Sequence, residues 1–88
     1  MEFLVEIKVD LPRGFPNARE LLKEEVRIGL RLREEGTILI LCENPEGMGN
    51  IGIWRADDEP ALRSIIDSLP LRQHMTCGLT PLEKLSGQ

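Results

Sequence analysis

The sequence predicts an α+β fold in which four strands form one antiparallel sheet and two helices cover one of its faces. Three observations support this prediction. The chain has 88 residues, which is enough for a single domain spanning residues 1–88. Its hydrophobic patterns follow the order strand, helix, strand, strand, helix, strand, which is the ferredoxin-like βαββαβ arrangement. Segments rich in proline and glycine fall between these patterns.

The first part of the chain predicts a strand followed by a long helix. Apolar residues alternate with charged ones over residues 2–10, a period of two that is typical of a strand. Residues 11–16 contain two prolines and a glycine, which break the pattern. Asn17 is a natural N-cap for a helix over residues 18–35, and Gly36 would end that helix.

The middle of the chain predicts two strands joined by a loop. Residues 37–42 form a continuous apolar run that is short enough to be a buried strand. Residues 44–49 contain proline and glycine and predict a loop. Residues 50–56 follow as a third strand, with two isoleucines on one face.

The last part predicts a second helix and a fourth strand. Asp58 is a candidate cap for a helix over residues 59–68, which tolerates Pro60 because that residue lies in its first turn. Residues 74–80 can form the last strand, before Pro81. We expect residues 86–88, at the end of the chain, to lie outside the fold.

The arrangement leaves one face of the sheet without a helix. The unbroken apolar run 38–41 fits a strand that is buried on both sides. A chain of this size also buries only ~60–65% of the surface that its unfolded form exposes. We therefore predict a homodimer in which two subunits pack their sheets together.

Composition argues against several classes of partner. Fifteen acidic side chains face eleven basic ones, a net charge of −4, which gives no cationic surface for a phosphate backbone. With only three aromatic residues, a base-stacking platform is hard to build. No apolar stretch approaches the ~20 residues of a membrane span. We expect no nucleic acid and no membrane as partners.

The N-terminus and the cysteines favour a cytoplasmic protein. Glu2 and Glu6 interrupt the first apolar run, so that run is not a signal peptide. Cys42 and Cys77 are expected on the second and fourth strands, at opposite edges of the sheet, and cannot bond to each other within one chain. We expect both thiols to be free.

Nothing in the sequence implies a metal or an organic cofactor. One histidine and two separated cysteines give no zinc-ligand spacing. The segment Gly47-Met48-Gly49 lacks the buried strand before it and the helix after it that a dinucleotide-binding turn requires. We interpret it as a hairpin loop.

One carboxylate breaks the pattern of the first helix. At 100° per residue, Glu25 projects between Leu22 and Leu32, inside the apolar arc, with Gly29 beside it one turn on. Burial raises the pKa of a carboxyl group toward the range useful for proton transfer. The glycine leaves room for a ligand or another backbone. Glu25 is either a catalytic base or half of a structural ion pair with an arginine of the sheet or of a partner subunit.

Two further residues are weaker candidates. His74, the only histidine, lies where the last turn enters the fourth strand and could act as an acid or base. Arg72 beside it could hold a substrate carboxylate. A strand-end histidine and a surface arginine are the simpler interpretations of both.

The chain resembles the muconolactone Δ-isomerases of aromatic catabolism. The shared positions keep their spacing across nearly the whole chain, and the most specific of them is the Ser-Leu-Pro-Leu segment followed by a methionine. They are residues 1–9, Leu11-Pro12, residues 32–36, Asn50, residues 68–71, Met75 and residues 80–82.

This resemblance implies a dimeric α+β barrel, assembled in the family into a ring of five dimers. It also implies an isomerisation that moves a ring double bond in an unsaturated lactone, by removing a proton from one carbon and returning it to another without a cofactor. The family has an acidic residue at the position of Glu25, which the helical projection selects independently.

The substrate-facing residues differ from the family. Where the family has Leu-Trp-Arg in its second strand, this chain has Leu41-Cys42-Glu43, so an anion replaces a cation. Arg72 and His74 stand where the family has Phe and Tyr. We therefore expect an altered substrate, with Arg72 or Arg55 as the candidates for a substitute cation.

Two hypotheses of function follow. In the first, Glu25 is the general base of an isomerase acting on a small unsaturated or lactone-type metabolite, Asn50 orients this substrate, and His74 or Arg72 assists. In the second, the protein is a non-catalytic, oligomeric ligand-binding or accessory protein in which Glu25 is structural.

Overall fold

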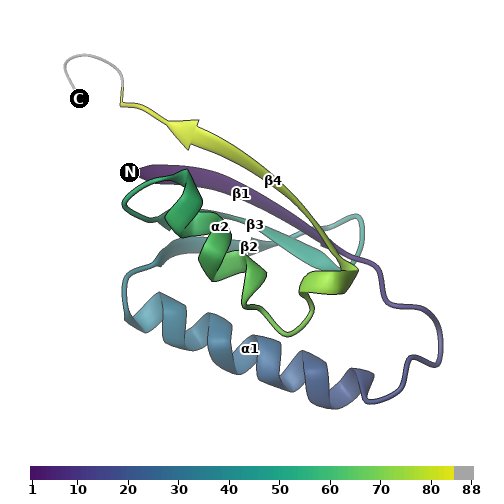
Figure 1. The fold of residues 1–88 in the computed structure, drawn as a ribbon. Coiled ribbons are helices and arrows are strands. Elements are labelled where there is room, and N and C mark those ends of the chain that lie inside the picture. The colour runs from purple at the N-terminus through teal and green to yellow at the C-terminus, as the bar shows by residue number, and fades with distance from the viewer. Residues whose placement is uncertain (85–88) are drawn as a thin grey trace.

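The computed structural model describes residues 1–84 and has the fold that the sequence predicts (Figure 1). The four strands form one antiparallel sheet in the order β2-β3-β1-β4, and both helices lie on the same face of it. The expectation for residues 86–88 concerns residues outside this described part. The elements are β1 (Glu2–Val9), α1 (Ala18–Glu34), β2 (Ile38–Glu43), β3 (Gly49–Arg55), α2 (Glu59–Asp67), the 3₁₀ helix η1 (Arg72–His74) and β4 (Met75–Leu82).

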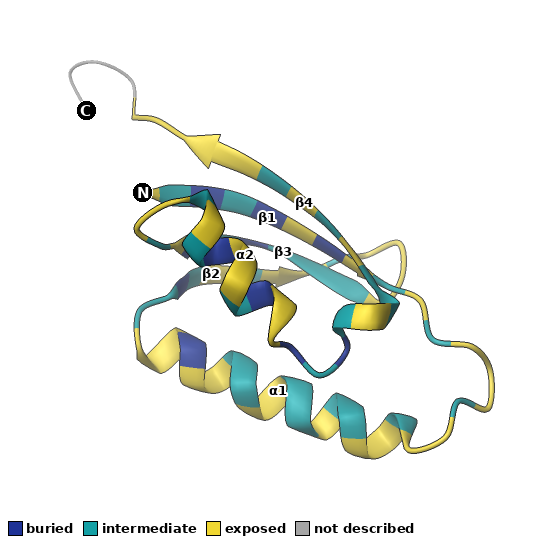
Figure 2. Ribbon diagram, in the orientation of Figure 1, coloured by how far each residue is buried: buried dark blue, intermediate teal, exposed yellow. Residues whose placement is uncertain are grey.

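The core lies between the sheet and α2. Phe3 and Val5 of β1 are fully buried, and so is Leu62 of α2. Helix α1 is covered much less: within the described residues it contributes only Leu32 to the buried set (Figure 2). This loose packing of α1 on the sheet leaves room between them.

The structure confirms the predicted C-terminal end of α1 and differs from the prediction at its N-terminal cap. Gly36 has φ 81°, its N–H donates to the Arg33 carbonyl at 3.1 Å, and the Thr37 N–H donates to Leu32 at 2.9 Å. This is a Schellman motif, which needs a left-handed residue at that point. Asn17 precedes the helix, but the predicted side-chain cap is wrong. Its backbone adopts φ 59° and its side chain makes no capping bond, because asparagine tolerates the left-handed region that the entering chain requires.

The predicted cap of α2 and the predicted hairpin loop are confirmed. The Asp58 carboxylate accepts a hydrogen bond from the Ala61 N–H at 2.8 Å. In the loop before β3, the Asn44 N–H donates to the Gly49 carbonyl at 3.2 Å. Gly49 has φ 140°, and a Cβ there would lie 2.1 Å from the Ile7 carbonyl oxygen, so only glycine fits.

The fourth strand is displaced from its predicted position. His74 belongs to η1, where its N–H donates to the Leu71 carbonyl at 2.9 Å, and the strand begins at Met75. At its other end the strand continues through Pro81, which pairs with Phe3. Proline is tolerated there because β4 is an edge strand of this sheet.

The face of the sheet away from the helices is partly apolar. In the register, Ile53 of β3 lies opposite Leu4 on one side and Ile40 on the other, and all three point to this face. Ile40 is 52% exposed. No helix within residues 1–84 covers this face (Figure 1). None of the helices in the described residues is long and apolar enough to cross a membrane.

Candidate active site

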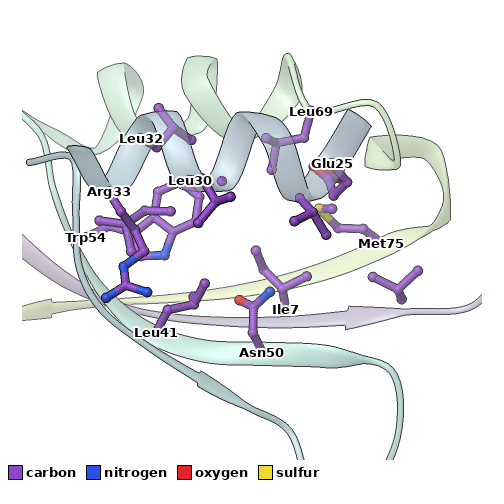
Figure 3. Close-up of a pocket in the computed structure, with 14 residues that line it drawn as sticks. Ile7, Glu25, Leu30, Leu32, Arg33, Leu41, Asn50, Trp54, Leu69 and Met75 are labelled. Atoms are coloured by element: carbon purple, nitrogen blue, oxygen red, sulfur yellow. The ribbon is translucent and has the colours of Figure 1, made fainter. Parts of the chain in front are cut away.

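A cavity of about 210 Å³ lies between α1 and the sheet (Figure 3). An apolar cavity of about 150 Å³ is large enough to bind benzene, so this volume suits a small metabolite. Most of the lining is apolar. It consists of Ile7, Val9, Glu25, Val26, Gly29, Leu30, Leu32, Arg33, Ile38, Leu41, Asn50, Trp54, Leu69 and Met75.

One stripe of α1 supplies the helix side of this cavity. Glu25, Gly29 and Arg33 are spaced by four residues, so they lie on the same side of the helix, and all three line the cavity. A Cβ added at Gly29 would meet no atom within 4 Å. The missing side chain at Gly29 therefore keeps the space between Glu25 and Arg33 open.

Glu25 is half-buried and accepts a hydrogen bond from the loop after α2. The Leu71 backbone N–H donates to its Oε1 at 3.2 Å. Burial raises the pKa of Glu25 above its ordinary value, and the bond from Leu71 opposes this increase only in part. Among residues 1–84, no cation lies within ion-pair distance of this carboxylate. A structural ion pair for Glu25 is therefore absent from this part of the chain.

The sheet side of the cavity carries two polar groups that have no hydrogen-bond partner in residues 1–84. Asn50 and Trp54 lie four residues apart on β3, so both side chains point to the cavity face. The Asn50 Oδ1 and the Trp54 Nε1 are buried, and neither has a hydrogen-bond partner among the described residues. Buried polar atoms are nearly always paired in folded proteins, so these two are available to a ligand.

The structure brings together two of the four residues that the sequence suggested. Glu25 and Asn50 share the cavity, whereas His74 and Arg72 do not line it. The His74 ring packs edge-on against Phe15, with centroids 4.5 Å apart. Catalytic assistance by these two residues stays a prediction.

Arg72 is engaged elsewhere through two hydrogen bonds. Its guanidinium donates to the Asp67 Oδ1 at 2.8 Å and to the Met75 carbonyl at 3.1 Å. The Asp67 carboxylate beside it raises the pKa of Arg72 further. Arg55 is paired as well, with Glu2 at 3.2 Å. Neither arginine lines the cavity, so neither is positioned there as the substitute cation.

Sequence reasoning missed Arg33 and Trp54. The helical projection puts Arg33 toward the far side of the apolar arc, and Trp54 reads as an ordinary core residue. The spacing 25, 29 and 33 was the available signal for Arg33, because it continues the stripe that Glu25 and Gly29 begin. No local pattern shows that the Trp54 N–H lacks a partner within residues 1–84.

The described residues contain no group of three or more His, Cys, Asp or Glu side chains that could hold a metal ion. The free thiols lie apart from the cavity lining. Cys42 is exposed, and burial raises the pKa of Cys77, which keeps that thiol protonated.

Comparison with protein families shows the family to which the chain belongs. The family model described as muconolactone delta-isomerase matches residues 1–86. The chain belongs to the muconolactone delta-isomerase family. A crystal structure of muconolactone isomerase at 3.3 Å resolution is similar over 100% of this chain and 94% of that one, with a TM-score of 0.89 and 27% sequence identity. No curated protein matches the sequence.

Because the chain belongs to this isomerase family, the position of Glu43 can be compared with that of the family's arginine. In the ladder between β2 and β3, Glu43 lies opposite Asn50, so both side chains point to the face of the sheet that holds the cavity. The residue at which the family typically has arginine is thus close to the Asn50 end of the cavity. Here that position carries a negative charge.

Proposed function

We propose that this protein is a cofactor-independent isomerase that moves a double bond in a small unsaturated or lactone-type metabolite of aromatic-compound catabolism. The observation that carries this proposal is Glu25: a carboxylate of raised pKa, without an ion-pair partner in the described residues, facing a mostly apolar cavity. Membership in the family supports the reaction class.

In the proposed reaction, a Glu25 oxygen removes a proton from a carbon next to the substrate carbonyl. The electron pair of the broken C–H bond stays on the substrate as an enolate. The protonated Glu25 then returns the proton to the carbon at the other end of the conjugated system, so the double bond moves and the proton count does not change. The Asn50 side-chain NH₂ can donate a hydrogen bond to the substrate oxygen on which negative charge develops.

The competing function is a non-catalytic ligand-binding or accessory protein. One contact favours it: the bond from the Leu71 N–H gives Glu25 a structural role, because it ties α1 to the loop after α2. Under this alternative the cavity would bind a ligand without exchanging its protons.

Proton exchange with solvent distinguishes the two functions before the substrate is known. The protein would be incubated in D₂O with a panel of five- and six-membered unsaturated lactones and small unsaturated acids, and followed by NMR. The proposal expects deuterium to enter at least one compound at the carbon next to the carbonyl, with wild type and not with Glu25→Gln. Exchange with neither protein across the panel would favour the accessory function.

We further propose that the functional unit is a homodimer, or a ring of five such dimers, in which two sheets pack together through the face that carries Leu4, Ile40 and Ile53. A monomer would leave this apolar face in water. Sedimentation at micromolar concentration should show no appreciable monomer. Ile40→Lys should shift the protein toward monomer, while Ile40→Val, which keeps the apolar surface, should not. A well-folded wild-type monomer would contradict the proposal.

Gly29 offers a separate test of the cavity. Gly29→Ala should raise the stability of the protein by up to ~1 kcal/mol, because alanine is the better helix former. The added methyl group enters the space between Glu25 and Arg33, so activity should fall roughly tenfold or more. Thermal melts and the exchange assay measure the two effects. A rise in stability with full activity would show that substrate does not occupy this part of the cavity.

A further inference from the structure

We propose that Arg33 and Trp54 form a carboxylate-binding subsite at the end of the cavity away from Glu25. The ligand would be a small acid with an apolar body, whose carboxylate and reacting carbon lie at opposite ends. This inference rests on the proposed function in one respect, since it takes the cavity to be the substrate site.

Arg33 is the cation that the cavity offers. Among the described residues that line the cavity, it is the only one with a positively charged side chain. Five other arginines form ion pairs, but Arg33 has no carboxylate within 4.0 Å in residues 1–84. A guanidinium remains charged at every relevant pH and presents a fork of N–H groups that matches the two oxygens of a carboxylate.

Trp54 adds a second, independent observation. Its side chain is 2% exposed, and its indole N–H has no acceptor in the described residues. A buried donor without a partner is unfavourable, and an oxygen of a bound ligand would relieve this. Figure 3 shows Trp54 toward the same end of the cavity as Arg33, with Glu25 toward the other end.

The spacing of the polar residues along α1 and β3 shows which of them share an end of the cavity. Glu25 and Arg33 are eight residues apart on α1, which is about 12 Å along the helix axis. Asn50 and Trp54 are four residues apart on β3, which is about 13 Å along the strand. The two residue pairs are therefore separated by nearly the same length along the helix and along the strand. Glu25 and Asn50 define one end of the cavity, and Arg33 and Trp54 define the other.

The chemistry at the Arg33 end favours a carboxylate. A single guanidinium with one indole N–H neutralises one negative charge and offers donors to two oxygens. The wall between the two ends is apolar and includes Leu30, Leu69 and Met75, which suits a hydrocarbon or ring. A phosphate dianion would need further cations, and the cavity lining supplies none among the described residues.

Trp54 also supplies the signal for a binding experiment. It is the only tryptophan of the chain, and there is no tyrosine, so intrinsic fluorescence reports on the cavity directly. The probes are phenylacetate and its methyl ester, which differ in charge. Wild type should bind the acid more tightly than the ester, and added salt should weaken only the binding of the acid.

Arg33→Gln should weaken the binding of phenylacetate by at least roughly tenfold, and change the binding of the ester by less than about twofold. Arg31→Gln is the matched control, because Arg31 lies on the same helix, pairs with Glu35 and does not line the cavity. It should bind both probes as wild type does.

Trp54→Phe removes the indole N–H and keeps a buried ring. Binding to this variant is measured by calorimetry, because the only tryptophan is gone. It should weaken the binding of the acid severalfold and the binding of the ester less, because an ester oxygen is a weaker acceptor than a carboxylate oxygen. Equal binding of the acid by wild type, Arg33→Gln and Arg31→Gln would overturn the proposal, as would preference for the ester or no binding of the acid in the millimolar range. These readouts need no turnover. If the acid binds through Arg33 but no proton exchanges in the D₂O assay, the proposed function fails and the subsite stands.

Discussion

Glu25→Gln is expected to abolish proton transfer while leaving the protein as stable as wild type, or slightly more stable. A general base typically contributes ~10²–10⁴-fold to a rate, and glutamine cannot accept the proton. Glutamine has nearly the same shape, and its amide oxygen can still accept the hydrogen bond from the Leu71 N–H. It also removes a charge whose burial is unfavourable, so stability should stay level or rise by ~1 kcal/mol.

The stability effect of Glu25→Gln should depend on pH, and the raised pKa of Glu25 fixes its sign. The folded state holds the proton more tightly than the unfolded chain does, so the stability contributed by the protonated group is fully present below the ordinary value of 4.5. That contribution is lost as pH rises through the pKa of the folded state. Wild type should therefore lose stability relative to Glu25→Gln over this interval, and the two should converge at lower pH.

Thermal melts of both proteins between about pH 4 and 8 measure this difference, with 1 kcal/mol corresponding to roughly 4–8 °C for a domain of this size. Glu24→Gln is the matched control. Glu24 lies next to Glu25 but is paired with Arg27 on the surface, so this change should leave activity intact. A loss of ~3 kcal/mol in Glu25→Gln would instead show that the carboxylate anchors a cationic partner, and would support the accessory function.

Local patterns in the sequence indicate the position of Glu25, the cap of α2 and the order of the elements. Glu25 stood out because a charge inside the apolar arc of a helix must be explained, and the structure places it at the cavity. Asp58 caps α2 because the capping bond spans three residues. The sheet order follows from the order of the elements, which the chain reveals directly.

Features that depend on contacts between distant segments could not be predicted from the sequence. His74 contacts Phe15 and Arg72 contacts Asp67, and neither His74 nor Arg72 lines the cavity. Their catalytic assistance stays a prediction. The extension of β4 through Pro81 depends on its place at the edge of the sheet. The proposed role of Trp54 depends on the lack of an acceptor for its indole N–H among residues 1–84, which no local pattern reveals.

Muconolactone is expected to be a poor substrate of the wild-type protein, and Glu43→Arg is expected to improve its turnover. Glu43 lies opposite Asn50 on the cavity face of the sheet, at the end where Glu25 would act. A lactone that carries its carboxylate close to the reacting ring would meet a negative charge there. Losing one charge-assisted contact costs ~1.5–3 kcal/mol, and repulsion adds to this cost.

An isomerisation assay with authentic muconolactone tests this expectation. Wild-type kcat/KM should fall below ~10⁴ M⁻¹s⁻¹, the lower end of the usual range for enzymes. Glu43→Arg should raise it at least roughly tenfold, and Glu43→Gln, which removes only the repulsion, should give a smaller gain. Glu43 is exposed, so neither change should disturb the fold.

Efficient turnover by the wild type would mean that another cation binds the carboxylate of muconolactone. Arg55 is paired with Glu2 and Arg72 with Asp67, and among residues 1–84 Arg33 is the cation that lines the cavity. A carboxylate bound at Arg33 would keep the lactone ring away from Glu25, because Arg33 and Glu25 lie at opposite ends of the cavity. The double mutant Glu43→Arg, Arg33→Gln separates the two positions: if the carboxylate of muconolactone belongs beside Asn50, the double mutant should retain the gain of Glu43→Arg.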